Sequence, residues 1–237
     1  MNFLAFDTST DVMSIAVGKT GEGTAGAAQQ WLHTATGGAK ASTGLIAGVM
    51  DLLHQAGLAL TDLDAIAFGA GPGSFTGLRT ACSVAQGLAF GADVPVLPID
   101  TLLAVSEEAR YTACATSKTL RLTALLDARM DEMYAATYDY ADGVWTEVQG
   151  SHLVRPEAFA AEHAVAGNVF AVYGERLGGL AGITALPTAQ AMLRLAPALM
   201  AAGKAVPADQ ALPSYIRDKV AKTTAERMAE KAASAAQ

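Results

Sequence analysis

The sequence predicts an α/β protein with a duplicated, actin/Hsp70/sugar-kinase-like two-lobe fold. First, the order strand–strand–strand–helix–strand–helix occurs twice along the 237 residues. Second, each copy opens with an apolar strand that ends in aspartate, Leu4-Ala5-Phe6-Asp7 and then Ala124-Leu125-Leu126-Asp127. We therefore expect an amino-terminal lobe over residues 1–100 and a carboxy-terminal lobe over residues 101–237.

The elements of the first copy follow from apolar runs separated by turn residues. Strands are expected at 3–7, 12–17, 24–33, 65–69 and 94–98. Helices are expected at 42–56, 76–90 and about 101–110. Gly57 ends the first of these helices.

The second copy follows the same rules and leads into a polar carboxy-terminal tail. Strands are expected at 121–127, 133–140, 146–154 and 169–173, and helices at 156–164 and 189–202. After Pro213 the chain mixes basic and acidic residues and ends in a run rich in alanine. We expect this tail to be helical or frayed.

The segment Gly69-Ala70-Gly71-Pro72-Gly73-Ser74-Phe75-Thr76-Gly77-Leu78-Arg79 links a strand to the helix at 76–90. Its glycines and proline indicate a backbone path that other residues would follow only with strain, and Ser74 or Thr76 caps the helix. A dinucleotide-binding loop would need glycine at position 74, and no lysine follows as in a P-loop. We therefore expect Gly71, Gly73 and Gly77 to serve the backbone and not to bind substrate.

The string Gly71-Pro72-Gly73-Ser74-Phe75-Thr76-Gly77-Leu78-Arg79 closely resembles the central motif of the TsaB family. These proteins are the non-catalytic subunits of the bacterial machinery for tRNA threonylcarbamoyladenosine. The resemblance extends to Leu4-Ala5-Phe6-Asp7-Thr8-Ser9-Thr10, to Ala85-Gln86-Gly87-Leu88-Ala89 and to Asp127-Ala128-Arg129-Met130. It departs at Ala70, where many relatives carry a long side chain, and it weakens between about 144 and 207.

Composition limits which partners this chain can bind by itself. The formal charge is −7, and residues 1–100 hold three basic against eight acidic side chains, a net of −5. Nucleic-acid affinity depends on Lys and Arg, so this half is a poor tRNA surface. Two cysteines imply no disulfide framework. Neither a signal peptide nor a membrane span is expected, so we expect a cytoplasmic protein.

The two aspartate hairpins would hold metal and phosphates in a working kinase of this fold. Here they are Asp7-Thr8-Ser9 and Asp127-Ala128-Arg129, without an adjacent glycine and with arginine where a phosphate would enter. Asp7 and Asp127 are therefore expected to be vestigial, with no cofactor. The resemblance implies that the catalytic paralogue binds metal through two histidines four residues apart. None of His33, His54, His152 and His163 has such a partner, so no metal site is expected.

Two helices carry unusually few charges on the side away from their apolar arcs. The apolar arc of the helix at 42–56 is read as Leu45, Ile46, Val49, Leu52 and Leu53, with Gly48 on the opposite side. We expect a protein interface on the outward faces of the two helices, because few charges with Met, aromatic and Arg side chains are typical of interface cores. It comprises Ala47, Met50, Asp51, His54, Arg79, Thr80, Ser83, Gln86, Gly87 and Phe90. Coverage by another part of the same chain is the alternative.

The resemblance implies a scaffold or activator subunit without catalysis of its own. Its expected partners are a homologous TsaD-type catalytic subunit and a small TsaE-type ATPase, with tRNA bound only through the complex and a homodimer when the chain is alone. The assembly would transfer a threonylcarbamoyl group to the tRNA adenosine beside the anticodon. The alternative is an independent small-molecule kinase or ATPase of the same fold, for which Gly178-Gly179 is a candidate adenine clamp.

Overall fold

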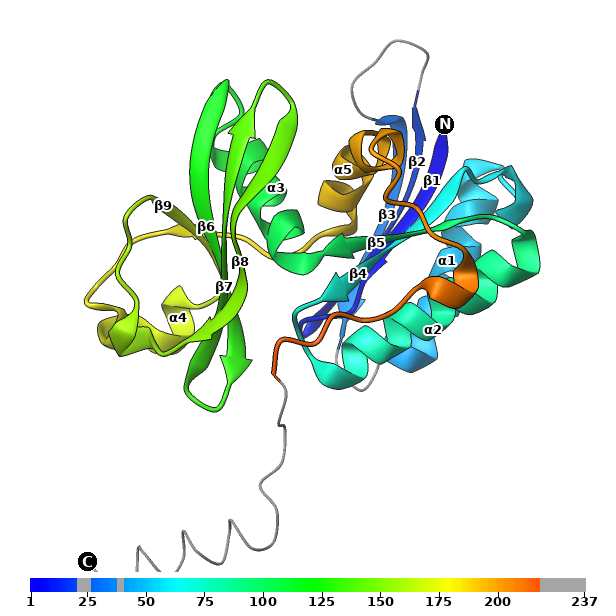
Figure 1. Cartoon of the computed structure of the whole chain (residues 1–237). Helices are drawn as coiled ribbons and strands as arrows, with labels where there is room; N and C mark the ends of the chain where they lie inside the picture. The colour runs from blue at the N-terminus through cyan, green and yellow to red at the C-terminus, as the bar shows by residue number, and fades with distance from the viewer. Residues whose placement is uncertain (21–26, 38–40, 218–237) are drawn as a thin grey trace, which may run out of the picture.

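Two mixed β-sheets stand side by side in the computed structural model, which describes residues 1–20, 27–37 and 41–217 (Figure 1). The first sheet has the order β3-β2-β1-β4-β5, and the second has the order β10-β9-β6-β7-β8. The strands of the first sheet are β1 (Asn2–Asp7), β2 (Val12–Thr20), β3 (Ala27–Thr36), β4 (Ala65–Gly71) and β5 (Val96–Asp100). Those of the second are β6 (Thr119–Arg129), β7 (Glu132–Ala141), β8 (Val144–Val154), β9 (Ala164–Gly167) and β10 (Ile183–Thr184).

The two sheets repeat one topology. β1 pairs antiparallel with β2 and parallel with β4, while β6 pairs antiparallel with β7 and parallel with β9. The outer strands match as well, because β3 and β8 are antiparallel to their neighbours and β5 and β10 are parallel to theirs. The predicted duplicated two-lobe α/β fold is therefore confirmed.

The longer helices divide between the outer face of the first sheet and the space between the sheets, and the short helix α4 (Phe170–Tyr173) lies on the far side of the second sheet (Figure 1). α1 (Ala41–Ala56) and α2 (Phe75–Ala92) pack on one face of the first sheet, over a core that includes Phe6 and Phe68. α5 (Ala189–Ala201) covers the opposite face around Phe3 and Leu97. α3 (Thr101–Ala113) packs against β6 and also contacts α5. The expected division of the chain into lobes between residues 100 and 101 stays a prediction. α5 belongs by sequence to the expected carboxy-terminal lobe, but it packs on the first sheet.

Two expected elements after β8 are wrong. The segment expected to be a helix at 156–164 forms a 3-10 turn at Pro156–Ala158, and its end begins β9, which pairs with β6. The strand expected at 169–173 is instead the short helix α4 (Phe170–Tyr173). Val169 and Tyr173 are buried while Ala171, which would share their face in a strand, is exposed, so the burial follows the spacing of a helix.

Parts of two other expectations lie outside the described residues. The third strand was expected at 24–33; β3 occupies Ala27–Thr36, and positions 24–26 are not among the described residues. The tail from 218 to 237 is outside them too. Among the helices that the structure describes, none is both long and apolar enough to span a membrane.

Candidate functional site

The glycine motif folds against the turn that follows β1. Ser74 N–H donates to the Ser9 carbonyl at 2.7 Å, and Thr8 Oγ1 donates to the Gly77 carbonyl at 2.7 Å. A Cβ added at Gly77 would lie 2.9 Å from the Thr8 carbonyl carbon and closer still to its oxygen. A Cβ at Gly73 would lie 2.6 Å from Ser9 Cβ. Both positions need glycine because two backbone segments touch there.

Gly71 and Ser74 give the motif its change of direction. Gly71 has a φ of +124°, which residues with a side chain rarely adopt. A Cβ added there would also collide with the Ser214 carbonyl oxygen. Ser74 is the N-cap of α2, with its hydroxyl 3.5 Å from the Gly77 amide, whereas Thr76 lies inside the first turn. These contacts support a backbone role for the three glycines.

Asp7 lies under the cleft between the lobes and not in it. Its side chain is fully buried, and Oδ1 accepts from the Ser9 amide at 2.9 Å and the Ser9 hydroxyl at 2.8 Å. Oδ2 has no hydrogen-bond partner among the described residues, and Gly69 leaves the space in which it fits. Burial raises the pKa of Asp7 to about 7, because it disfavours the charged form more than the Ser9 bonds favour it.

Asp127 does line the cleft, but its oxygens are already engaged. Oδ1 accepts from the Tyr173 hydroxyl at 2.7 Å and from the Arg129 amide at 2.9 Å, and Oδ2 lies 3.1 Å from Arg129 Nη1. The same guanidinium reaches across the cleft, with Nη2 2.8 Å from Asp11 Oδ2. Arg129 thus joins the two hairpins across the cleft.

The cleft has a volume of about 350 Å³ and receives residues from both lobes. Its walls include Asn168, the turn after β6, and the motif residues Pro72, Gly73, Ser74, Phe75 and Leu78. The segment 214–217 closes one side of it. Gly178 and Gly179 both have left-handed φ values, but they are not among the lining residues.

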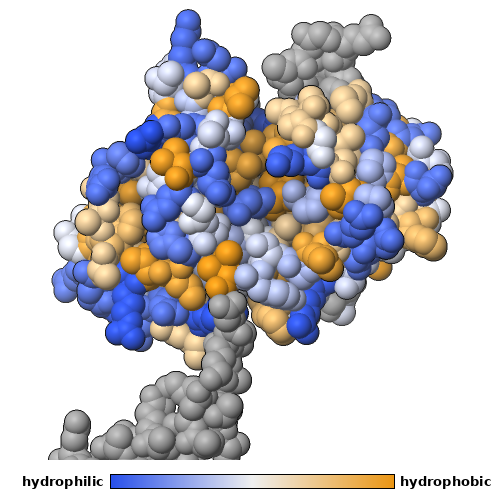
Figure 2. Space-filling model, in the orientation of Figure 1, coloured by the Kyte–Doolittle hydropathy of each residue, from blue (hydrophilic) through white to orange (hydrophobic). Residues whose placement is uncertain are grey.

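The expected interface residues lie on the outer sides of α1 and α2, which contact each other. Eight of the ten are exposed, Phe90 by 83% and Met50 by 47%, whereas Thr80 and Gln86 are half-buried. The Gln86 amide donates to the Ala211 carbonyl at 2.9 Å, and Arg79 Nε donates to the Tyr215 hydroxyl at 2.9 Å. Part of the expected interface on α2 is therefore covered by the same chain. In Figure 2, hydrophobic residues reach the surface of this lobe among hydrophilic ones.

Helical periodicity misplaced two residues of α1. Ile46 was expected in the buried arc but is 51% exposed, beside Met50 on the outer side. Gly48 was expected to face outward but is buried, since an added Cβ would lie 2.7 Å from Ile15 Cδ1 of β2. The close approach of β2 rotates the buried arc of α1 towards Gly48 and leaves Ile46 in solvent.

Comparison with known proteins places this architecture in a family. The family model described as "TsaD: tRNA N6-adenosine threonylcarbamoyltransferase" matches residues 27–235. The tRNA threonylcarbamoyladenosine biosynthesis protein TsaB of Escherichia coli is 33% identical over 93% of this chain and 96% of its own length. TsaB of Haemophilus influenzae is 33% identical over 93% of this chain and 95% of its length. The chain belongs to the TsaB family.

Solved structures agree with the TsaB assignment. YeaZ from Pseudomonas aeruginosa superposes with a TM-score of 0.77 at 35% identity, covering 90% of this chain and 99% of the other. Another Pseudomonas aeruginosa structure, described as similar to peptidase YeaZ, gives a TM-score of 0.79 at 35% identity, with coverage of 91% and 99%. The match with the TsaD model shows in addition that TsaB is homologous to a transferase.

One of those descriptions uses the word peptidase, and it is said there of the Pseudomonas protein. His33 lies on β3, His54 on α1, His152 on β8 and His163 just before β9. Within the described ranges, no three His, Cys, Asp or Glu side chains gather into a group that could hold a metal ion. Hydrolysis by a zinc-bound water needs about three such ligands.

The buried Asp7 predicts a pH-dependent stability in this TsaB relative. Between about pH 4 and 7 the folded chain keeps the Asp7 proton that the unfolded chain has lost, so the free energy of unfolding falls as pH rises. The full loss is at most about 4 kcal/mol, from three pKa units at about 1.4 kcal/mol each. The Asp7→Asn variant cannot ionise there and should lack this loss.

Urea denaturation of both proteins at about pH 5 and about pH 8 measures this difference. The two proteins share Asp100, whose pKa is also raised by burial, so subtracting one profile from the other isolates Asp7. Parallel stability profiles for wild type and Asp7→Asn would contradict the prediction.

Proposed function

We propose that this protein is a non-catalytic subunit of the assembly that makes threonylcarbamoyladenosine in tRNA, and that it binds a homologous TsaD-type transferase through α1 and α2. The observation that carries the proposal is the exposed apolar strip on these two helices. Ile46, Met50 and Phe90 are exposed by 51%, 47% and 83%. Large apolar side chains on a low-charge helical face are typical of interface cores.

The homology between the partners supports a two-fold arrangement. The TsaD model matches residues 27–235, a range that includes α1 and α2, so we expect a TsaD-type partner to carry two equivalent helices. Pairing the equivalent faces would bring four helices into one bundle. Gly87, with no atom within 4 Å of an added Cβ, leaves room for a partner helix to approach closely.

The state of the two aspartates supports the absence of catalysis by this subunit. Asp7 is fully buried. Asp127 accepts a hydrogen bond from Tyr173 and forms an ion pair with Arg129. Neither carboxylate faces the cleft with a free oxygen for a metal ion. The net charge of −5 in residues 1–100 disfavours tRNA binding by this lobe, which supports tRNA binding mainly by the other subunits. A TsaE-type ATPase is the second partner in this proposal.

Reconstitution tests the proposal. The chain is mixed with a TsaD-type subunit, a TsaE-type ATPase, the threonylcarbamoyl adenylate and tRNA, and formation of the modified nucleoside is measured. We expect modification to require this chain, and the chain alone to show neither ATP turnover nor peptidase activity. Equal modification without the chain would refute the subunit role.

The cleft itself favours a second candidate function, a small-molecule kinase or ATPase. It has the volume of a ligand site and lies between the two hairpins. An assay of ATP turnover by the isolated chain distinguishes the two functions. Turnover of ATP by the isolated chain that is lost in the Asp127→Asn variant would establish the kinase and exclude a purely structural subunit.

A further inference from the structure

The last described segment of the chain crosses the first lobe and ends on the second. Val206 pairs with Val96 at the edge of the first sheet, and the chain then runs along α2 (Figure 1). Ala211 is fully buried, and its carbonyl accepts from Gln86 Nε2 at 2.9 Å and from Cys82 Sγ at 3.4 Å. We name residues 211–217 the strap.

The strap is fixed to the glycine motif of the first lobe. Ser214 N–H donates to the Ala70 carbonyl at 2.7 Å, and the Ser214 carbonyl lies against the open side of Gly71. The Tyr215 ring packs against Phe75 with centroids 5.4 Å apart, and its hydroxyl accepts from Arg79. Gly71 thus has a second use besides the turn, because any side chain there would displace the strap.

The strap is then fixed to the second lobe by Ile216, which packs against the core of that lobe, and by Arg217. The Arg217 Nη2 lies 2.6 Å from Glu132 Oε2 and 3.4 Å from the Arg129 carbonyl, at the turn between β6 and β7. The Arg217 side chain is only 13% exposed. A charge-assisted bond that is largely shielded from water is stronger than a surface ion pair. The strap therefore ties the motif to the opposite hairpin.

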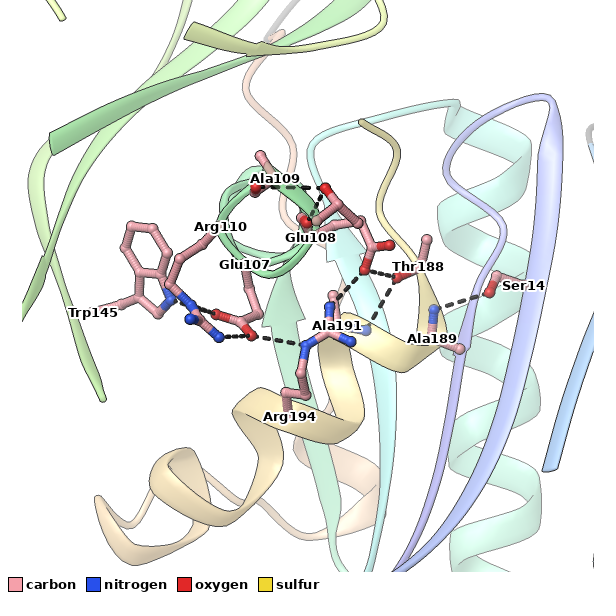
Figure 3. A network of polar contacts seen from close by, with 11 residues as sticks. Ser14, Glu107, Glu108, Ala109, Arg110, Trp145, Thr188, Ala189, Ala191 and Arg194 are labelled. Carbon is pink, nitrogen blue, oxygen red and sulfur yellow. Dashed lines mark hydrogen bonds and ion pairs between the residues drawn. The ribbon is translucent and has the colours of Figure 1, made fainter. Parts of the chain in front are cut away.

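A buried network joins the two lobes on the far side, between α3 and α5 (Figure 3). Glu107 is buried, with only 3% of its surface exposed. Its carboxylate accepts hydrogen bonds from Arg110, Arg194 and the Trp145 indole. Glu108 accepts from Arg194 and from the Thr188 hydroxyl. A buried network of this kind resists separation, because each broken bond leaves a charge without a partner.

The two sides of the cleft differ in how they are held. At the cleft, besides the strap, Arg129 pairs with Asp11, but these side chains are 69% and 81% exposed, and such a surface pair contributes little to stability. We propose that the strap is a clamp that keeps the inter-lobe cleft closed, with the α3–α5 network as the hinge. Releasing Arg217 from Glu132 opens the cleft about that hinge. This inference does not depend on the proposed function.

Pulsed electron spin resonance of the full chain tests the clamp. Nitroxide labels are placed on cysteines at Gln55 and Glu175, two exposed positions on different lobes, after Cys114→Ser. Buried Cys82 is kept because it contacts the strap, and a chain without the two new cysteines reports any label on it. The inter-label distance distribution is compared between wild type, Arg217→Ala and Glu132→Gln.

We expect both variants to shift the distribution to longer distances by more than its wild-type width, and the double variant to shift no further than either one. Leu212→Ala, at a strap residue that is 69% exposed, and Asp11→Asn, which breaks the surface pair, should leave it unchanged. If Arg217→Ala does not fold, Glu132→Gln decides, because it leaves the strap intact. A wild-type distribution in folded Glu132→Gln, or an equal shift in Asp11→Asn, would overturn the clamp.

Discussion

Replacing Gly77 by alanine is expected to lower the free energy of unfolding by more than about 4 kcal/mol, which is a large part of the stability of a typical domain. The new Cβ would lie 2.9 Å from the Thr8 carbonyl carbon and closer to its oxygen. The colliding group is backbone at the end of β1, so it cannot rotate away as a side chain could. Moving it also breaks the bond between Thr8 Oγ1 and the Gly77 carbonyl. Urea denaturation followed by circular dichroism measures the effect.

Gly87→Ala is the matched control in the same helix. No atom lies within 4 Å of a Cβ added at Gly87, so the new methyl group meets open space. Alanine favours the helix over glycine, and we expect a gain of up to about 1 kcal/mol. A Gly77→Ala variant with stability close to wild type would mean that the motif can shift away from the β1 turn, and the structural role of Gly77 would be wrong.

The duplicated fold was predictable because its signals are local. Each copy begins with an apolar strand that ends in aspartate, and β1 and β6 fall on those two runs. Short apolar runs are less informative, because length and composition do not separate a strand from one helical turn. The run from Val169 to Tyr173 therefore resembles a strand in sequence, although Ala171 is exposed between the buried Val169 and Tyr173.

The site was only partly predictable, because burial and long-range contacts do not appear in local patterns. The aspartate hairpins could be found, but not that Asp7 lies beneath the cleft while Asp127 lines it. Nor could the strap be found, since residues 211–217 have no periodicity and their side-chain hydrogen bonds reach partners at least 85 residues away in the sequence. The low-charge face of α2 was found, but the strap already holds its Arg79 and Gln86.

Replacing Gly87 by arginine is expected to abolish association with the proposed TsaD-type partner while the isolated chain stays folded. The position is exposed and open, so a long side chain extends into solvent in the free protein. In the complex the same charge would be buried without a partner, which costs about 3–5 kcal/mol. That cost weakens binding by at least about a hundredfold. Ser83→Glu, at another exposed position one turn away, should act in the same way.

Three controls make the Gly87→Arg result specific to the α1–α2 face. Gly87→Ala should bind as wild type does, because a methyl group adds no charge. Thr146→Arg places the same charge on exposed β8 of the other lobe and should also leave binding unchanged. Titration calorimetry gives the Kd, and the reconstituted tRNA-modification assay should fall in parallel. Wild-type affinity and full modification with Gly87→Arg would place the partner surface elsewhere, since no interface core tolerates a buried unpaired arginine at its centre.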